Sequence, residues 1–178
     1  MTPDDLKALV RTVPDFPRPG ILFRDITTLI GHGAGFAAAV RLLAERLDRA
    51  DVDAVAGIEA RGFIFGAALA ASLGKPFLPI RKPGKLPVPS VGINYALEYG
   101  TDRLELDPGA VAQGMRVAVV DDLIATGGTA LAATRLLRRA GARVDHAVFV
   151  IDLPDLGGAD RLRSEAAIVE ALIAFPGH

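Results

Sequence analysis

The residues best suited to chemistry lie together in the stretch 117–129, where two adjacent carboxylates follow an apolar run. Asp121 and Asp122 can each accept a hydrogen bond from a hydroxyl group, which suits the pair to a sugar diol rather than to an anion. Two threonines and two glycines come next, and their hydroxyls and unobstructed amides can bind a phosphate at the start of a helix. The stretch therefore predicts a sugar-phosphate site, with the diol on the carboxylates and the phosphate on Ala125, Thr126, Gly127, Gly128 and Thr129.

Two further stretches carry cations that could face an anionic ligand. Arg61 follows the apolar run 53–58 and precedes a second apolar segment, so that its guanidinium and a helix N-terminus could bind phosphate together. The stretch 81–95 places Arg81, Lys82 and Lys85 among prolines and glycines without a steady hydrophobic period. Because a loop of this length in a compact domain is usually functional or mobile, we expect it to form a lid.

Hydrophobic periodicity predicts the elements that must position these residues. Amphipathic or fully apolar helical patterns cover residues 34–50, 62–73 and 130–140. Short apolar runs predict strands at 53–58, 77–80, 117–120 and 144–151, and we expect 166–175 to be another strand. The alternation of strands and helices predicts an α/β fold with a central parallel sheet, in which ligands bind at the carboxyl ends of the strands. Two segments, 14–20 and 81–95, do not fit this alternation and are expected to be irregular.

Length and composition exclude several classes of protein. A chain of 178 residues is expected to form a single domain, since domains average about 150 residues. It has no cysteine, which excludes disulfides and cysteine-ligated metals, and its net charge of −1 gives no general attraction for nucleic acid or an anionic membrane. No apolar run approaches the roughly 20 residues that span a bilayer, and the first residues do not resemble a signal peptide. We therefore expect a cytoplasmic protein.

Common nucleotide and metal motifs fail at specific positions. Residues 57–62 lack the lysine of a P-loop, and 31–36 lack the third glycine of a dinucleotide-binding turn. The sequence contains no serine-hydrolase elbow and no His-Glu-x-x-His pattern. The three histidines, His32, His146 and His178, are too scattered to suggest a metal site.

The stretch 117–129 resembles the phosphoribosyl-diphosphate motif of the type I phosphoribosyltransferases. Four other stretches are similar to the adenine phosphoribosyltransferases of that family and occur in the same order: 16–27, 59–63, 81–87 and 97–100. The resemblance covers most of the chain from residue 14 to about 155 and is weak near the C-terminus, which we do not expect to touch the site.

The resemblance implies a type I phosphoribosyltransferase fold for the single domain 1–178. Residues 1–33 would form an N-terminal arm and base-binding hood, and about 81–100 a mobile lid. The implied reaction transfers the 5-phosphoribosyl group from phosphoribosyl diphosphate to adenine, giving AMP and diphosphate. Mg²⁺ would be carried with the diphosphate rather than held directly by protein side chains. The family also implies a homodimer, with no nucleic-acid or membrane partner.

The same resemblance implies residue roles beyond the sugar-phosphate site. Glu98, Arg61 and the two aspartates would be catalytic, with Tyr99 beside them on the lid. Diphosphate would contact Glu59, Ala60, Arg61, Arg81, Lys82 and Lys85, and a cis peptide is typical of the loop at 59–62. Adenine would contact Leu22, Phe23, Arg24 and Leu123.

Several of these residues also have a plainer structural interpretation. Arg61 can be a surface charge beside a helix start, and Lys85 a solvated side chain. Glu98 can be an exposed residue at the end of a strand, and Phe23 a core residue of a small N-terminal cap. The plainer interpretation of 117–129 is that its residues only end a strand and begin a helix. Of all these structural interpretations, this one fits its stretch least well.

Two other functions stay open. A phosphoribosyltransferase for hypoxanthine, xanthine or guanine would keep the phosphate motif and differ near 22–24. A non-catalytic regulator could use the same fold to sense phosphoribosyl diphosphate. Such regulators usually add a DNA-binding domain, and this chain has neither room for a helix-turn-helix nor a basic excess.

Overall fold

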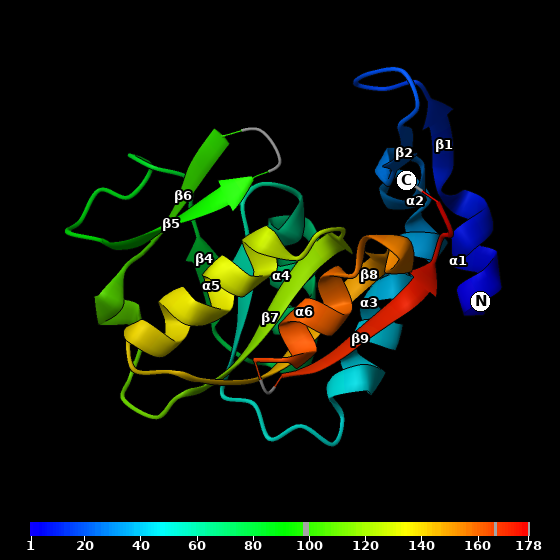
Figure 1. Cartoon of the computed structure of the whole chain (residues 1–178). Helices are drawn as coiled ribbons and strands as arrows, with labels where there is room; N and C mark the ends of the chain where they lie inside the picture. The colour runs from blue at the N-terminus through cyan, green and yellow to red at the C-terminus, as the bar shows by residue number, and fades with distance from the viewer. Residues whose placement is uncertain (98–99, 166, 178) are drawn as a thin grey trace.

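A sheet of five parallel strands forms the centre of the computed structural model, which describes residues 1–97, 100–165 and 167–177 (Figure 1). Its strands are β3 (Ala54–Ile58), β4 (Phe77–Ile80), β7 (Arg116–Ile124), β8 (Arg143–Asp152) and β9 (Ile168–Ala174). Their order across the sheet is β4–β3–β7–β8–β9, and every neighbouring pair is parallel. The predicted α/β fold with a parallel sheet is therefore confirmed, and so is the strand expected near the C-terminus.

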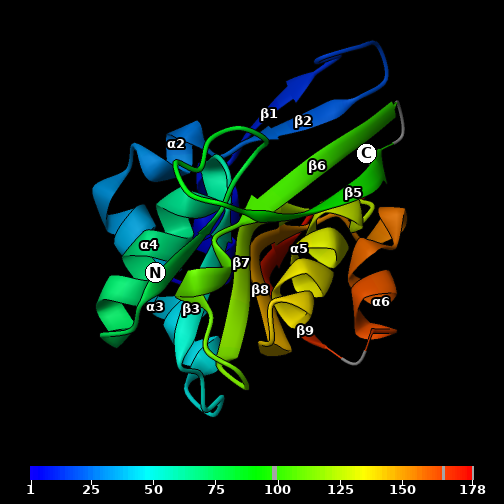
Figure 2. The same cartoon turned by 90° about the vertical axis from the view of Figure 1, so that its left-hand side faces the viewer.

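Helices cover both faces of this sheet (Figure 1, Figure 2). On one face lie α3 (Gly33–Leu47) and α4 (Arg61–Leu73), and on the other α5 (Gly128–Arg139) and α6 (Gly158–Arg163). The three helices predicted from periodicity are present, and α4 ends as predicted at Gly74. Within the described residues, no helix is long and apolar enough to cross a membrane.

Side chains of β7 alternate between two hydrophobic cores. Val119 packs in the core under α5, together with Leu136, whereas Val120 packs in the core under α4, together with Leu69. All five residues of β3 are buried, as expected for a parallel strand covered on both faces. The two cores fix the strands whose carboxyl ends carry the candidate site.

Strand β7 is longer than the apolar run 117–120 predicts, because it continues through both aspartates to Ile124. Its pairing with β3 ends at Val120, opposite Gly57, whereas its pairing with β8 continues as far as Ile124, opposite Asp152. Residues 121–124 therefore pair with a neighbouring strand on one side only, that of β8. Their other side is open for a ligand.

The segment 81–95, predicted to be irregular, is only partly so. Two antiparallel strands, β5 (Val91–Leu97) and β6 (Gly100–Leu106), form a hairpin that packs on α5. The prediction was wrong for 91–95 because the β5 sequence has no clear alternation, and its strand structure depends on pairing with β6. Glu98 and Tyr99 lie outside the described residues.

The N-terminal residues form a separate hood whose first helix contacts β9, whereas the β5–β6 hairpin contacts β4 at the opposite edge of the sheet (Figure 1, Figure 2). The hood contains α1 (Pro3–Leu9), β1 (Arg11–Pro14), β2 (Leu22–Asp25) and α2 (Thr27–Ile30). The strands β1 and β2 are antiparallel. Residues 15–21 connect them without helix or strand, as the prolines predict, although Pro14 itself ends β1.

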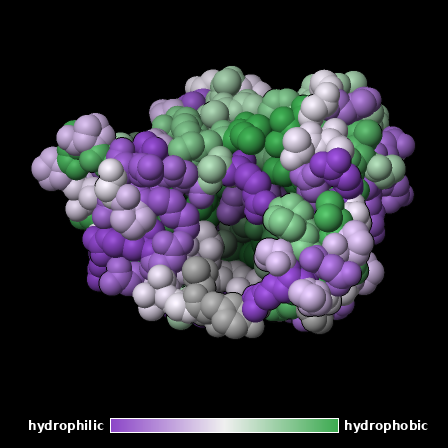
Figure 3. Space-filling view, turned by 90° about the horizontal axis from the view of Figure 1, so that it is seen from above, coloured by the Kyte–Doolittle hydropathy of each residue, from purple (hydrophilic) through white to green (hydrophobic). Residues whose placement is uncertain are grey.

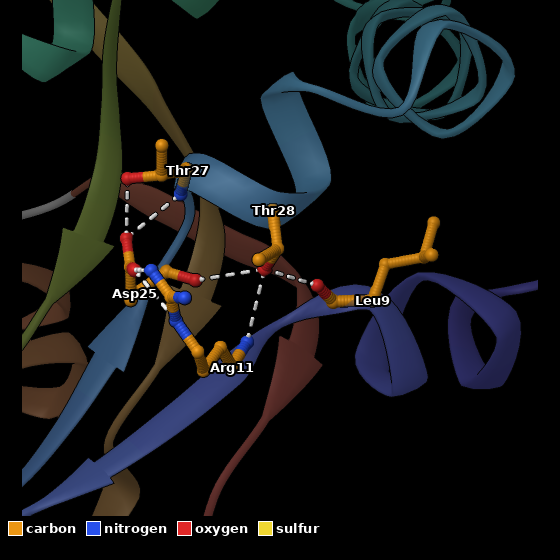
Figure 4. A network of polar contacts seen from close by, with 5 residues as sticks. All are labelled: Leu9, Arg11, Asp25, Thr27 and Thr28. Atoms are coloured by element: carbon orange, nitrogen blue, oxygen red, sulfur yellow. Dashed lines mark hydrogen bonds and ion pairs between the residues drawn. The ribbon is translucent and has the colours of Figure 1, made fainter.

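Asp25 joins the elements of the hood (Figure 4). Its carboxylate accepts hydrogen bonds from the backbone N–H of Thr27 at 2.9 Å, from the Thr27 hydroxyl and from Arg11 Nε at 3.0 Å. The Thr28 hydroxyl adds a second link, donating to the Leu9 carbonyl at 2.6 Å and accepting from the Arg11 amide at 3.2 Å. The hydrogen bonds from Thr27 and Arg11 lower the pKa of Asp25 to about 2.

Asp25→Asn is expected to reduce the free energy of unfolding in a pH-dependent way. A carboxyl whose pKa is lowered on folding stabilises the fold above its unfolded pKa, and this contribution is lost as the pH falls through the folded pKa. The difference in the free energy of unfolding between the wild type and the variant should therefore be largest above about pH 5 and become smaller toward about pH 3. Urea unfolding at both pH values measures it, and an equal difference at both would show that the charge of Asp25 is unimportant.

Candidate active site

A cavity of about 260 Å³ opens at the carboxyl ends of β3 and β7. Strand β3 lies between β4 and β7, so the chain goes from β3 to one neighbour and then crosses to the other. Ligands bind at such switch points in open α/β sheets. Seen from above, the surface is hollowed in its middle (Figure 3). The residues lining the cavity are Ile58, Glu59, Ala60, Arg61, Lys82 and the stretch 121–130.

The two aspartates of β7 lie against the start of α4. A Cβ atom at Gly62 would come within 2.6 Å of Asp121 Oδ1, so only glycine allows α4 to begin this close to the strand. Arg61 Nε lies 2.8 Å from Asp122 Oδ2. Asp122 is 3% exposed, and its buried Oδ2 is held in this ion pair without a well-aligned hydrogen bond from the described residues.

Burial sets the charge state of the acidic pair. It raises the pKa of Asp121 well above its ordinary value, and the adjacent charge of Asp122 raises that pKa further. Burial also raises the pKa of Asp122, while the guanidinium of Arg61 opposes the increase. Arg61 is therefore the group that favours the charged form of Asp122 against the effect of burial.

Residues 125–129, named here the phosphate loop after the ligand predicted from the sequence, lead from β7 into α5. Gly127 adopts a left-handed conformation with φ 78°, and α5 begins at the next residue. The first amides of a helix have no partner within it, so those of α5 can donate to an anion. Thr129 adds a hydroxyl, 3.5 Å from the Tyr95 hydroxyl.

The phosphate loop rests on the backbone at the start of α6. The Gly158 amide donates to the Ala125 carbonyl at 3.0 Å. A Cβ atom on Gly127 would lie 2.7 Å from the Gly158 carbonyl oxygen, and one on Gly158 would lie 2.2 Å from the Ala125 carbonyl oxygen. Sequence analysis missed the role of Gly158, although the glycine pair 157–158 was a signal of close backbone approach.

The loop after β3 carries the predicted diphosphate-binding residues. The Glu59–Ala60 peptide is cis, as the resemblance implies. Glu59 accepts hydrogen bonds from Arg81 Nε at 3.0 Å and from the Lys82 amide at 2.8 Å, and the bond from Arg81 is the main cause of its lowered pKa. Arg81 and Lys85 do not line the cavity, whereas the other four residues of this predicted group do.

Lys82 is held in the cavity by two residues of the β5–β6 hairpin. Its ammonium group donates to the Tyr95 hydroxyl at 3.1 Å and forms an ion pair with Asp102. Burial lowers the pKa of Lys82, but the bonds to Asp102 and Tyr95 outweigh it, and the net shift is upward. Lys82 therefore remains a cation. Sequence analysis missed Tyr95 and Asp102 because their proximity depends on the hairpin.

The residues predicted to contact a base lie on two sides of the cavity opening. Leu123 lines the cavity, whereas 22–24 lie on β2 and do not. The Phe23 ring centroid is 5.8 Å from Arg61 Cζ, which places this ring near the cavity. The Arg24 side chain is buried against Thr12 and the C-terminal residues, so that it is not directed into the cavity.

This arrangement can bind a phosphorylated sugar next to a second anion. The phosphate loop supplies amides and hydroxyls, the acidic pair supplies acceptors for a diol, and Arg61 and Lys82 supply positive charge. The predicted sugar-phosphate residues, 121, 122 and 125–129, are all brought together around one cavity.

Comparison with known proteins agrees with this geometry. The sequence pattern of the phosphoribosyl transferase domain matches residues 27–172. The adenine phosphoribosyltransferase of Novosphingobium aromaticivorans is 68% identical over 178 residues, which is 100% of both chains. The crystal structure of the adenine phosphoribosyltransferase of Thermoanaerobacter pseudethanolicus is 44% identical and matches with a TM-score of 0.93, covering 98% of this chain and 100% of that one.

The adenine phosphoribosyltransferase of Saccharomyces cerevisiae is 38% identical, with a TM-score of 0.88 and coverage of 96% of this chain and 98% of that one. Its structure contains D-2,5-dideoxy-2,5-imino-altritol 1,6-bisphosphate and adenine. The similarities extend over the whole fold and include the elements that build the cavity. The chain belongs to the phosphoribosyl transferase family and, within it, to the adenine phosphoribosyltransferases.

Proposed function

We propose that this protein transfers the 5-phosphoribosyl group from phosphoribosyl diphosphate to adenine, giving AMP and diphosphate. The observation that carries this proposal is the cavity at which β7 presents a buried acidic pair beside the phosphate loop. A yeast relative with the same fold has been solved with a sugar bisphosphate analogue and adenine together. Both substrates therefore have a counterpart in a protein of this family.

In the proposed complex, the phosphate loop binds the 5′-phosphate, and Asp121 and Asp122 accept hydrogen bonds from the ribose hydroxyls. The C1′–oxygen bond to diphosphate breaks, and its electrons leave with the diphosphate. Adenine N9 forms the new bond to C1′ and loses its proton. Arg61 and Lys82 face the leaving group, whose growing negative charge they stabilise.

The lid has two roles in this proposal. Positive charge develops on the sugar as the C1′–oxygen bond breaks, as in other glycosyl transfers, and water would intercept it in an open site. Closure of residues 81–100 would exclude that water. We assign proton acceptance or base binding to Glu98, with Tyr99 beside it, by resemblance to the family; both lie outside the described residues.

Adenine is favoured over other purines by its 6-amino group. A main-chain carbonyl of the hood that accepts from this group would face an unpaired acceptor if hypoxanthine or guanine were bound, which costs about 1–3 kcal/mol. We place the base against β2, between Phe23 and Leu123, with contacts from the main chain of Leu22 and Arg24. Transfer to hypoxanthine, xanthine or guanine is the alternative.

The cavity fits a Mg²⁺ ion that arrives with the substrate. Within the described residues, no three His, Cys, Asp or Glu side chains are grouped so as to hold a metal. Asp121 and Asp122 are nevertheless carboxylates at the cavity, and Mg²⁺ often combines one or two carboxylates with substrate phosphates. When bound, the ion would neutralise part of the diphosphate charge.

We also propose that the protein is a cytoplasmic homodimer, as the family resemblance implies. Exposed apolar side chains near the hood support an interface there, since Phe16 is 51% and Leu22 37% exposed. Light scattering on the purified protein tests this proposal, and a mass of one chain at all concentrations would contradict it.

The proposed reaction is tested by incubating purified protein with phosphoribosyl diphosphate, Mg²⁺ and each purine base in turn. We expect AMP and diphosphate in equal amounts from adenine, and at least tenfold lower kcat/KM for hypoxanthine, xanthine and guanine. Faster conversion of another base would assign the alternative specificity. Binding of phosphoribosyl diphosphate without conversion of any base would indicate a sensor.

Asp122→Asn is expected to lower turnover at saturating substrate at least tenfold, which corresponds to about 1.4 kcal/mol. The amide leaves Arg61 without its partner and replaces one acceptor oxygen facing the ribose by a donor. Steady-state kinetics with both substrates saturating measures this effect. Asp160→Asn, at a carboxylate that is 83% exposed, is the control. An unchanged kcat in Asp122→Asn would refute the assigned role.

A further inference from the structure

The Arg24 side chain of the hood is buried without a carboxylate partner. It is 8% exposed and has no ion pair within the described residues. Its Nη1 donates to the Thr12 hydroxyl at 2.7 Å and its Nη2 to the Pro176 carbonyl at 3.2 Å, while Nε has no partner. Burying a guanidinium in this way is unfavourable compared with an apolar side chain of similar size. Its contacts therefore indicate a role in orientation rather than in stability alone.

Phe175, near the C-terminus, also contacts the Arg24 side chain. Its ring centroid lies 4.5 Å from Arg24 Cζ and 4.9 Å from Lys7 Nζ, both within the range of cation–π interactions. The ring is 8% exposed. Because Phe175 directly follows β9, its contact with Arg24 connects β2 of the hood to the edge of the central sheet.

The same C-terminal residues are also tied to the other half of the cavity. The Gly177 amide donates to Asp155 Oδ2 at 2.7 Å. Asp155 lies in a short 3₁₀ helix, Pro154–Leu156, and this segment leads directly to Gly158, on which the phosphate loop rests. Residues 175–177, named here the C-terminal strap, therefore contact the hood at one point and the support of the phosphate loop at another.

We infer that the C-terminal strap and the Arg24 side chain are positioning elements that set the distance between the base-binding strand β2 and the phosphate loop. This inference rests on the proposed function, since it takes β2 as the strand that binds adenine. The C-terminal residues do not line the cavity, and the inference gives them an indirect role through the hood. A misplaced base loses the alignment of N9 with C1′, and small misplacements of reacting groups reduce rates strongly.

The inference predicts that KM for adenine and KM for phosphoribosyl diphosphate respond differently to changes at Arg24. In Arg24→Met, which keeps side-chain length and removes the charge and hydrogen bonds, KM for adenine should rise roughly tenfold and kcat should fall. KM for phosphoribosyl diphosphate should change less than about twofold, because the phosphate loop keeps its own support from Gly158. Arg41→Met, at an exposed arginine of α3 paired with Glu45, is the matched control and should leave all three constants unchanged.

Phe175 variants separate positioning from direct contact with the base. Phe175 touches Arg24 from the side of the C-terminus, and Phe175→Leu keeps an apolar side chain there while removing the cation–π contact. We expect KM for adenine to rise in this variant too. In the double variant with Arg24→Met the effects should be less than additive, because both changes remove the same contact.

Each outcome has a defined meaning. Fully additive effects would overturn the inference, because they would show that Arg24 and Phe175 do not act through their shared contact. An unchanged KM for adenine in both single variants would also overturn it, even where thermal unfolding shows a lower Tm. Equal increases in KM for both substrates would also overturn it. Failure of the wild type to convert adenine would instead refute the proposed function, so the two failures are distinguishable.

Discussion

Arg61→Ala is expected to lower kcat/KM for phosphoribosyl diphosphate roughly hundredfold, a loss of about 2.7 kcal/mol of transition-state stabilisation. The variant removes a cation from the wall of the cavity that faces the leaving diphosphate. It also removes the guanidinium 2.8 Å from Asp122, which opposes the increase that burial causes in the pKa of that carboxyl. Two separate contributions are thus lost with a single side chain.

Three further variants test the prediction for Arg61. Arg61→Lys keeps the charge but not the planar fork of donors, so that it should recover only part of the activity. In Arg61→Ala combined with Asp122→Asn, the second change should cost less than it does alone, because the pair is already broken. Arg143→Ala, at a side chain that is 66% exposed and paired with Asp145, is the control. If kcat/KM for phosphoribosyl diphosphate falls less than about threefold in Arg61→Ala, Arg61 does not have the role assigned to it.

Gly127→Ala is expected to weaken phosphoribosyl diphosphate binding at least tenfold, which corresponds to about 1.4 kcal/mol. Two effects combine at this position. An L-residue at φ 78° is strained, and its Cβ atom would lie 2.7 Å from the Gly158 carbonyl oxygen. Since that neighbour is backbone, the phosphate loop itself must move, and its amides then lose their alignment with the phosphate.

Gly157→Ala provides a matched control for this second prediction. Gly157 has a similar φ of 70°, but a Cβ atom there meets nothing within 4 Å. The two variants therefore share the backbone strain and differ in the clash with Gly158. Calorimetric titration with phosphoribosyl diphosphate should show weak binding for Gly127→Ala and nearly normal binding for Gly157→Ala. Equal affinities would mean that the loop does not depend on its contact with Gly158.

Local sequence patterns were sufficient to predict the central sheet and three of its helices. Buried parallel strands are continuously apolar, and helix α4 is followed by Gly74, so that both types of element have signals within a few residues. The cavity could be predicted for the same reason, because the stretch 117–129 carries the acidic pair and the phosphate loop on consecutive residues.

The β5–β6 hairpin depends on contacts that are distant in the sequence. Leu104 and Leu106 alternate with charged residues, which was a usable signal for β6, whereas β5 has no such alternation. The places of Tyr95 and Asp102 beside Lys82 follow from the pairing of the two strands. The extension of β7 beyond its apolar run likewise depends on β8, its neighbour in the sheet.

The contacts that hold the hood and the phosphate loop in place were the least predictable part of the molecule. The Arg24 side chain packs on Phe175, about 150 residues away along the chain. Gly158 supports the phosphate loop from another element altogether. The Arg24–Phe175 contact has no local pattern, and the glycine pair 157–158 signals a close backbone approach without indicating which loop it meets.

A crystal structure of the protein with AMP tests the central claim most directly. We expect the 5′-phosphate to accept hydrogen bonds from amides of the phosphate loop, and the ribose hydroxyls to donate to Asp121 and Asp122. The adenine ring should lie toward Phe23 and Leu123. A nucleotide bound at another surface, with this cavity left empty at saturating AMP, would contradict the account.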